Sequence, residues 1–198
     1  DVYRWLDELK NQAVVKPDTP AAGKGVGVWG DHFNTREQLF EHFAANCQHG
    51  AVIIEEKIEG EESSFQAFCD GKHLVPLPET RDYKRAFDDD KGPNTGGMGA
   101  YKDSGDVLPF MTTEDKEREI ELINKLFKEL RKRANSTDLR GIPFYDAFMH
   151  NGKEPKILEN NSRPGDPEIQ CLLPILKDDF VDVCYRILEG NLTKVSLE

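Results

Sequence analysis

The stretch IPFYDAFMHNGKEPKILENNSRPGDPE, residues 142–168, decides the fold of this chain of 198 residues. Two apolar runs, 142–150 and 154–160, lie on either side of an Asn-Gly dipeptide, which is typical of tight β-hairpin turns. We therefore expect two antiparallel strands, followed by a compact polar turn with the sequence SRPGDPE.

The register of this hairpin predicts which side chains share a face of the sheet. With a two-residue turn, Asp146 lies opposite Ile157, and Glu159 is its diagonal neighbour on the same face. Asn161 continues that face because successive side chains of a strand point to opposite sides. Three oxygen-bearing side chains suit Mg²⁺ rather than zinc, whereas the plainer interpretation is a solvated polar face. A one-residue change in turn length would move Asp146 to the opposite face.

The segments around the hairpin predict an α+β chain with mainly antiparallel strands. Thr113 is expected to begin a helix that runs to about Ala134. Thr35 and Gln38 form a capping-box pattern for an earlier helix, whose predicted buried face includes Phe40. Further strands are expected at 13–16, 26–29, 51–57, 63–70 and 72–77, and further helices at 2–9, 169–176 and 179–188.

The composition excludes several classes of protein. Acidic residues number 37 against 26 basic ones, and the formal charge of −11 argues against general binding to nucleic acid or to an anionic membrane. The four cysteines lack zinc-binding spacing, and no stretch has the length and apolarity of a membrane span or a signal peptide. We expect a cytoplasmic protein with one domain or two small lobes.

Two glycine-rich segments contain basic residues suited to an anion. Lys16 ends an apolar strand, and Lys24 lies in AAGKGVG, which lacks Walker A spacing; an ordinary flexible turn is the alternative. The long segment 79–110 contains RDYKR, residues 81–85, and GPNTGGMGAY, residues 92–101. Basic residues followed by glycines suggest an anion pocket, with disorder as the alternative, and the apolar side chains among the glycines favour packing.

The run EEKIEGEE, residues 55–62, contains five carboxylates. A solvated strand end is the usual explanation of such a run. The functional interpretation is a linker whose backbone meets the edge of an adenine, with one glutamate accepting hydrogen bonds from ribose hydroxyls. The pattern alone does not favour either.

The chain resembles the glycinamide ribonucleotide synthetases, ATP-grasp ligases of purine synthesis, in the segments VVKPDTPAAGKGV, VIIEEKIEGEESSF, RDYKR, GPNTGGMGAY and ILENNSRPGDPEIQ. The resemblance covers nearly the whole chain, and its most specific part is GPNTGGMGAY followed by E-x-N-x-R-x-G-D-P-E-x-Q. It implies one ATP-grasp domain over 1–198, with a nucleotide-clamping lobe at about 12–78 and a larger catalytic lobe at about 79–198. ATP would lie between two mainly antiparallel sheets. The family's N-terminal and C-terminal domains would be missing partners.

The resemblance also implies roles for particular residues. For the nucleotide it implies Lys16 and Lys24 at the phosphates, backbone groups of Glu55 and Ile58 at the adenine, Glu62 at the ribose, and Glu56 beside them. For Mg²⁺, with Mn²⁺ as a substitute, it implies Glu159 and Asn161, with Asp146 as a third ligand where many relatives have a small residue. For glycine and 5-phosphoribosylamine it implies Asp82, Lys84, Arg85, Asn94, Thr95, Gly96, Gly97, Met98, Arg163, Gly165, Asp166, Pro167 and Glu168. The expected catalytic residues are Lys84, Arg163 and Asp166.

The implied reaction joins glycine to 5-phosphoribosylamine through a glycyl phosphate, while ATP becomes ADP and phosphate. Such a reaction needs positioning and charge neutralisation rather than a side-chain nucleophile. Two alternatives stay open: a nucleotide-binding fragment without turnover of its own, and an ATP-grasp ligase for another carboxylate.

Overall fold

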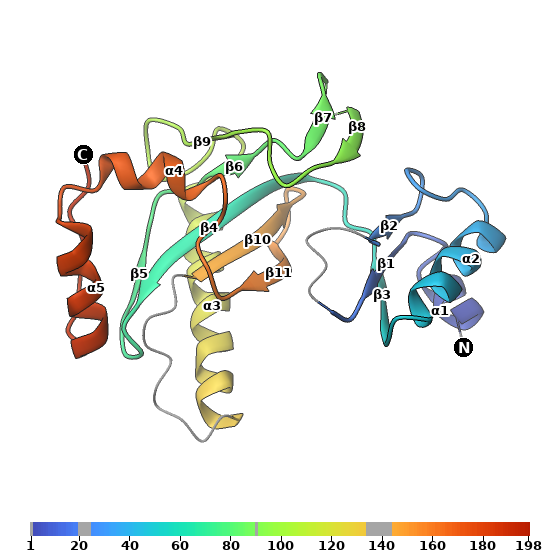
Figure 1. Ribbon diagram of the computed structural model, residues 1–198, viewed down its shortest axis with the longest axis horizontal. Coiled ribbons are helices and arrows are strands. Elements are labelled where there is room, and N and C mark those ends of the chain that lie inside the picture. Colours follow the sequence, from blue (N-terminus) through green and yellow to red (C-terminus); the bar gives the residue numbers. More distant parts are fainter. Residues whose placement is uncertain (1, 20–24, 90, 134–143) are drawn as a thin grey trace. The chain divides into compact units, whose positions relative to one another are not determined.

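The chain forms two compact units, Asp1–Ile58 and Glu59–Glu198, in the computed structural model (Figure 1). The residues described are 2–19, 25–89, 91–133 and 144–198. The boundary lies at Ile58 rather than near residue 78, because strand β4 (Glu61–Cys69) pairs with strand β10 (Phe144–His150) of the second unit. Within the described ranges, every helix is too short or too polar to cross a membrane.

The first unit is a small antiparallel sheet with two helices. Its sheet has the order β2-β1-β3, and its elements are α1 (Val2–Glu8), β1 (Ala13–Pro17), β2 (Gly27–Val28), α2 (Arg36–Cys47) and β3 (Val52–Glu56). Ala13 and Val15 pack against Leu6 and Leu39 in a buried core. Because side chains alternate along β1, Lys16 lies on the other face of the sheet.

The predicted capping box of α2 is confirmed. The Thr35 hydroxyl accepts from the backbone N–H of Gln38, and the Gln38 side chain accepts from the Thr35 N–H. Leu39 is fully buried, whereas Phe40, which was expected in the core, is 42% exposed. Phe40 points instead along α1, where its ring stacks on Tyr3 with 6.0 Å between centroids.

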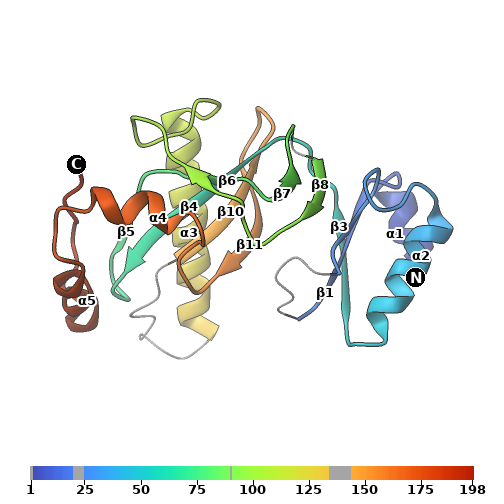
Figure 2. The ribbon, with the colours of Figure 1, turned by 45° about the horizontal axis from the view of Figure 1, so that its top comes forward.

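The second unit is built on a four-stranded antiparallel sheet with the order β11-β10-β4-β5, in which β5 is Leu74–Pro76 and β11 is Lys156–Asn161. Helix α3 (Thr113–Arg133) covers one face of this sheet (Figures 1 and 2). The core between them contains Phe65, Ala67, Cys69, Ile123, Phe127 and Phe148. The opposite face is therefore left to the loops and short helices.

The N-cap of α3 is Thr112 rather than the expected Thr113. Its hydroxyl accepts from the Asp115 N–H at 3.1 Å, and the Asp115 carboxylate accepts from the Thr112 N–H at 2.8 Å. This reciprocal pair satisfies two backbone donors at the helix start. Leu130, near the C-terminal end of α3, is 36% exposed.

The C-terminal segment packs over β4 and β5. It consists of α4 (Ile169–Leu172), the short 3₁₀ helix η1 (Leu173–Ile175) and α5 (Phe180–Glu189). Asp179 caps α5, and Gly190 ends it with φ +70°, as the sequence predicted. Phe68 of β4 joins Val183 and Ile187 of α5 in a second core.

The long segment 79–110 is ordered by its own short ladders. β6 (Arg81–Asp82) pairs with β9 (Ala100–Tyr101), and β7 (Arg85–Phe87) pairs with β8 (Lys91–Asn94). The expectation that this segment packs against the rest of the unit is confirmed, because Thr80 pairs with β4 and leads directly into β6.

Candidate functional site

One face of the large sheet gathers polar side chains from three strands, on the side opposite α3. We call it the site face. The residues on it are Glu62, Ser64 and Gln66 of β4, Tyr145 and Ala147 of β10, and Glu159 and Asn161 of β11. Glu159 and Asn161 thus share a face, as predicted.

The predicted register of the β10–β11 hairpin is wrong. Residues 151–155, rather than a two-residue turn, separate the strands, and Met149 pairs with Lys156 instead of Glu154. This change moves the register by an even number of residues, so by itself it would leave every side chain on its predicted face.

A β-bulge then places Asp146 on the face opposite the site face. The register shifts after Ala147, so that Asp146 pairs with Asn160, whose side-chain amide donates to the Asp146 carboxylate. Asp146 is fully buried, and burial raises its pKa to about 7 although the Asn160 amide acts in the opposite direction. The structure therefore separates Asp146 from Glu159 and Asn161, with which it was expected to share a metal ion.

Lys84 connects the glycine-rich segment to the site face. Its ammonium forms ion pairs with Glu62 and, at 3.3 Å between Nζ and Oδ1, with Asp82. Burial alone would lower the pKa of Lys84, but Glu62, Tyr145 and Asp82 outweigh burial and raise it. Burial raises the pKa of Glu62 even though Lys84 opposes that shift. Glu62 and Lys84, predicted for the ribose and for the substrates, thus belong to one ion-pair network.

The two glycine-containing motifs meet at Gly97 and Pro167. Gly97 has φ +120°, and a Cβ atom at this position would collide with the Pro167 ring. Upstream, the Lys84 carbonyl accepts from the Thr95 N–H at 2.7 Å and from the Thr95 hydroxyl at 3.0 Å. The PNTGG loop is therefore folded back on RDYKR and packed against the SRPGDPE turn, so all three segments are in contact.

The SRPGDPE turn is attached to buried side chains of β4. The Gly165 N–H donates to Gln66 Oε1 at 2.9 Å, and the Ser64 hydroxyl donates to Glu168 Oε1 at 3.0 Å. Glu168, expected to bind substrate, is 1% exposed and faces the sheet. Asp166 is exposed, so of these two carboxylates only Asp166 is open to solvent.

Tyr145 occupies the middle of the site face, and sequence analysis missed it. The Arg163 guanidinium lies over its ring, with 5.7 Å between the guanidinium carbon and the ring centroid. Burial raises the pKa of the Tyr145 phenol, while Lys84 acts in the opposite direction. Ser64 and Gln66 were missed as well. Strand alternation from Glu62 could have found Ser64 and Gln66, whereas the face of Tyr145 depends on the β-bulge.

The Glu159 and Asn161 pair fits a hard divalent cation. The Asn161 amide donates to Glu159 Oε1 at 3.2 Å, so the two side chains are adjacent and both offer an oxygen atom. In the described part of the chain, no three His, Cys, Asp or Glu side chains are grouped to hold a metal by themselves. That finding suits Mg²⁺, which usually takes one or two protein ligands and completes its shell with water and phosphate oxygens.

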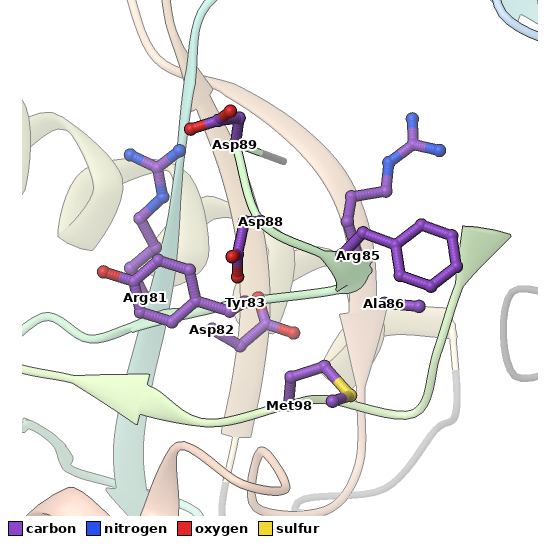
Figure 3. A pocket seen from close by; sticks show the side chains of 9 residues that line it. Arg81, Asp82, Tyr83, Arg85, Ala86, Asp88, Asp89 and Met98 are labelled. Atoms are coloured by element: carbon purple, nitrogen blue, oxygen red, sulfur yellow. The ribbon is translucent and has the colours of Figure 1, made fainter. Parts of the chain in front are cut away.

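A pocket of about 530 Å³ opens on the segment around β6 and β7 (Figure 3). The residues that line it are Arg81, Asp82, Tyr83, Arg85, Ala86, Phe87, Asp88, Asp89 and Met98. Three of them, Asp82, Arg85 and Met98, are predicted substrate residues. The lining combines two guanidinium groups and three carboxylates with aromatic and thioether surface, so it offers groups of both charges to a polar ligand.

In the first unit, Lys16 forms an ion pair with Glu55 on the sheet face away from the helices. The Lys57 N–H donates to Gln12 at 3.0 Å, and Val14 pairs with Glu55, so the backbone groups of Glu55 point toward β1. Those of Glu56 point away from β1. The backbone groups of Glu55, which were expected at the adenine, therefore bond within the sheet. Lys24 lies outside the described residues.

Comparison with known proteins agrees with this geometry. The family described as phosphoribosylglycinamide synthetase, ATP-grasp (A) domain, matches residues 1–169. The chain is 42% identical over 202 residues to the phosphoribosylamine–glycine ligase of Methanocella arvoryzae, covering 100% of this chain and 45% of the relative. It is 41% identical over 199 residues to that of Thermococcus kodakarensis, covering 100% and 46%.

Among solved structures, the crystal structure of phosphoribosylamine–glycine ligase from Thermotoga maritima superposes with a TM-score of 0.79 at 28% identity, covering 100% of this chain and 49% of that one. The chain thus spans about half the length of the relatives that it matches. It belongs to the phosphoribosylglycinamide synthetase family and has the α+β ATP-grasp fold of that family's A domain.

Proposed function

We propose that this chain supplies the nucleotide-binding and catalytic part of a ligase that uses ATP to join glycine to 5-phosphoribosylamine in purine synthesis. One observation carries the proposal. Lys84, the PNTGG loop and the SRPGDPE turn, which lie far apart in the sequence, are in contact above a sheet face that carries Glu159 and Asn161. The cytoplasmic location expected from the sequence belongs to the same proposal.

The proposed chemistry has two steps. A carboxylate oxygen of glycine bonds to the γ-phosphorus of ATP, and the bond to the leaving ADP breaks. The amine of 5-phosphoribosylamine then bonds to the carbonyl carbon of the glycyl phosphate, phosphate leaves, and the nitrogen loses a proton. The first step brings a carboxylate to the anionic triphosphate, and the second builds negative charge on the carbonyl oxygen and the departing phosphate. Fixed cations such as Lys84 and Arg163 lower both barriers by offsetting this charge.

The metal in this proposal is Mg²⁺ at Glu159 and Asn161. When bound, it would neutralise charge on the phosphate oxygens of ATP. The role of the chain is to hold the two oxygen ligands side by side, which the β11 strand does by placing them two residues apart on one face. Asp146 is left out of the set because it faces α3.

For the nucleotide we propose Lys16 and Lys24 at the phosphates, Glu56 and Ile58 at the adenine edge, and Glu62 at the ribose. The contact of Glu62 with Lys84 supports a role for it next to the reacting groups. For glycine and 5-phosphoribosylamine we propose the residues of the three touching segments and of the pocket, among them Asp82, Lys84, Arg85, Arg163 and Asp166.

A second candidate is a nucleotide-binding fragment that does not turn over by itself. The chain spans about 45% of the length of the relative from Methanocella arvoryzae, so binding and turnover are tested separately. The ligase and the fragment are both expected to bind Mg·ATP, but only the ligase is expected to turn over its substrates. The test is to titrate Mg·ATP by calorimetry and then measure phosphate release with and without glycine and 5-phosphoribosylamine. Release that needs both substrates supports the ligase; binding without such release supports the fragment; no binding refutes both.

A further inference from the structure

Arg163 is presented to the site by an aromatic ring. It comes from the turn after β11, and its own backbone neighbourhood gives it one contact, a hydrogen bond from Nη1 to the Pro164 carbonyl at 2.8 Å. Its guanidinium carbon lies 5.7 Å from the centroid of the Tyr145 ring, within the distance at which a cation is attracted to an aromatic face. Tyr145 is 4% exposed and belongs to the central part of the sheet, so the ring itself cannot move freely.

The part of the turn that follows Arg163 is held at two further points. Gln66 accepts from the Gly165 N–H at 2.9 Å, and Ser64 donates to Glu168 at 3.0 Å. Tyr145 pairs with Gln66 in the β10–β4 ladder, and both Ser64 and Gln66 are 1% exposed. Three neighbouring residues of the sheet therefore contact the turn. Ser64 and Gln66 form hydrogen bonds with it, and Tyr145 contacts it through its aromatic face.

We infer that Tyr145 is a positioning residue for Arg163. The Tyr145 ring fixes the direction of the Arg163 guanidinium, so that this planar group is already oriented toward an anionic oxygen of the substrates. The inference rests on the proposed function, which identifies the ligand of Arg163 as a carboxylate or phosphoryl oxygen. A guanidinium that is held in one orientation loses less freedom when it binds a carboxylate or phosphate bidentately. The ring of Tyr145 rather than its hydroxyl makes this contact, because the guanidinium carbon of Arg163 lies over the aromatic face.

The first test does not depend on turnover. In the whole chain, the side-chain Nε–Hε resonance of Arg163 is compared by NMR in the wild type, Tyr145→Phe and Tyr145→Leu. Tyr145→Phe keeps the ring and is expected to keep the ring-current shift of Arg163, whereas Tyr145→Leu should abolish it. Phe110→Leu is the matched control, because Arg81 lies 5.5 Å from the Phe110 ring; it should shift Arg81 and leave Arg163 unchanged. If the chemical shift of the Arg163 Nε–Hε resonance is the same in Tyr145→Leu as in the wild type, the inference is wrong.

The second test asks whether the orientation matters. Substrate-dependent phosphate release should fall about tenfold or more in kcat for Tyr145→Leu, because small misplacements of a positioned group are costly, while Mg·ATP affinity changes less than about twofold. Tyr145→Phe should remain close to the wild type. If Tyr145→Phe loses as much as Tyr145→Leu, the hydroxyl rather than the ring is responsible, and the inference is wrong.

Arg163→Lys guards against a folding defect in Tyr145→Leu, because Arg163 is exposed and its replacement leaves the core intact. Lysine keeps the charge but lacks the flat stacking group. Its loss of kcat should match that of Tyr145→Leu, and the double variant should be no worse than either, as expected for residues that act as a unit. Additive losses contradict the inference. If the wild type releases no phosphate, the proposed function fails, and the NMR comparison alone decides the role of Tyr145.

Discussion

The two faces of the β4–β10–β11 sheet use the same strands for opposite purposes. On the site face, the carboxylates have side-chain partners: Glu62 is paired with Lys84, and Glu159 accepts from Asn161 of the same strand. On the α3 face, several buried polar atoms have no hydrogen-bond partner among the described residues. They are both carboxylate oxygens of Glu79, Oε2 of Glu119, Oδ2 of Asp146 and Nδ1 of His150.

This difference shows that the type of a residue does not predict its role until the face of the sheet on which it lies is known. Asp146 and Glu159 are both acidic and close in the sheet, yet one is fully buried under α3 and the other is exposed. A carboxylate that keeps contact with water and loops can hold a metal or a lysine. In Asp146, burial outweighs the single hydrogen bond from Asn160 and favours the protonated form. The predictions below test whether the two faces can be changed independently.

The largest expected effect is on the contact between loops above the site face. Gly97→Ala should lower the free energy of unfolding by about 3 kcal/mol, because alanine is strained at φ +120° and its methyl group collides with Pro167. Gly96→Ala is the matched control, since nothing lies within 4 Å of a Cβ atom there. Urea unfolding measures both, and equal stabilities of the two variants would show that the loop contact is not tight.

Glu159→Gln should weaken Mg·ATP binding by about 10-fold to 100-fold, as is common when a metal site loses a charged or orienting group. Folding should be unaffected because Glu159 is exposed on the site face. Calorimetry in Mg²⁺ measures the affinity, and Glu154→Gln is the control, since the Glu154 side chain is 86% exposed. Unchanged affinity in Glu159→Gln would refute the metal assignment.

Much of this arrangement could be predicted from the sequence, and the exceptions have identifiable causes. The apolar runs gave β10, β11 and α3, and the order of the glycine-rich and acidic motifs gave the family. The face of Asp146 could not be predicted, because it depends on one extra residue of β11, Leu158, which lies between the partners of Ala147 and Phe148 and leaves no mark in the sequence pattern. The partners Ser64, Gln66 and Tyr145 are ordinary strand residues, and only three-dimensional pairing shows that they hold the SRPGDPE turn.

Asp70 is a buried carboxylate with more hydrogen bonds than Asp146, and its pKa shifts in the opposite direction. Asp70 accepts from the backbone N–H groups of Lys72, His73 and Leu192 and from the His73 ring. Burial would raise the pKa of Asp70, but these hydrogen bonds lower it from 3.8 to about 2. Because the folded-state pKa is depressed, the resulting stability is present above pH 3.8 and is lost as the pH falls toward 2.

Asp70→Asn should therefore lower the free energy of unfolding at pH 7 by about 2 kcal/mol and flatten its dependence on pH between 4 and 2. Urea unfolding across that range measures the effect, and Asp103→Asn, at an exposed loop position, is the control. An Asp70→Asn variant with the wild-type acid dependence would show that the hydrogen bonds do not favour the charged form.

The smallest expected effect comes from Glu79, which has the opposite pH dependence. Glu79 is fully buried, and burial together with the neighbouring Glu119 raises its pKa well above 4.5, although Lys116 at 3.8 Å opposes the shift. A group whose folded-state pKa is raised contributes stability below its unfolded value, and that stability is lost as the pH rises through the folded-state value. The wild type should therefore become less stable as the pH rises above 4.5.

Glu79→Gln removes the charged form while keeping the shape, and its amide can donate to Glu119. We expect it to raise the free energy of unfolding by about 1 kcal/mol at pH 8.5 and to leave it nearly unchanged at pH 5, since a buried acceptor gains a donor. Glu117→Gln, exposed on the same helix as Glu119, should have no such effect. Mg·ATP affinity should be the same in the wild type and in Glu79→Gln. If Glu79→Gln changed that affinity as strongly as Glu159→Gln, the two faces would be coupled, and the division of the sheet into a binding face and a folding face would be wrong.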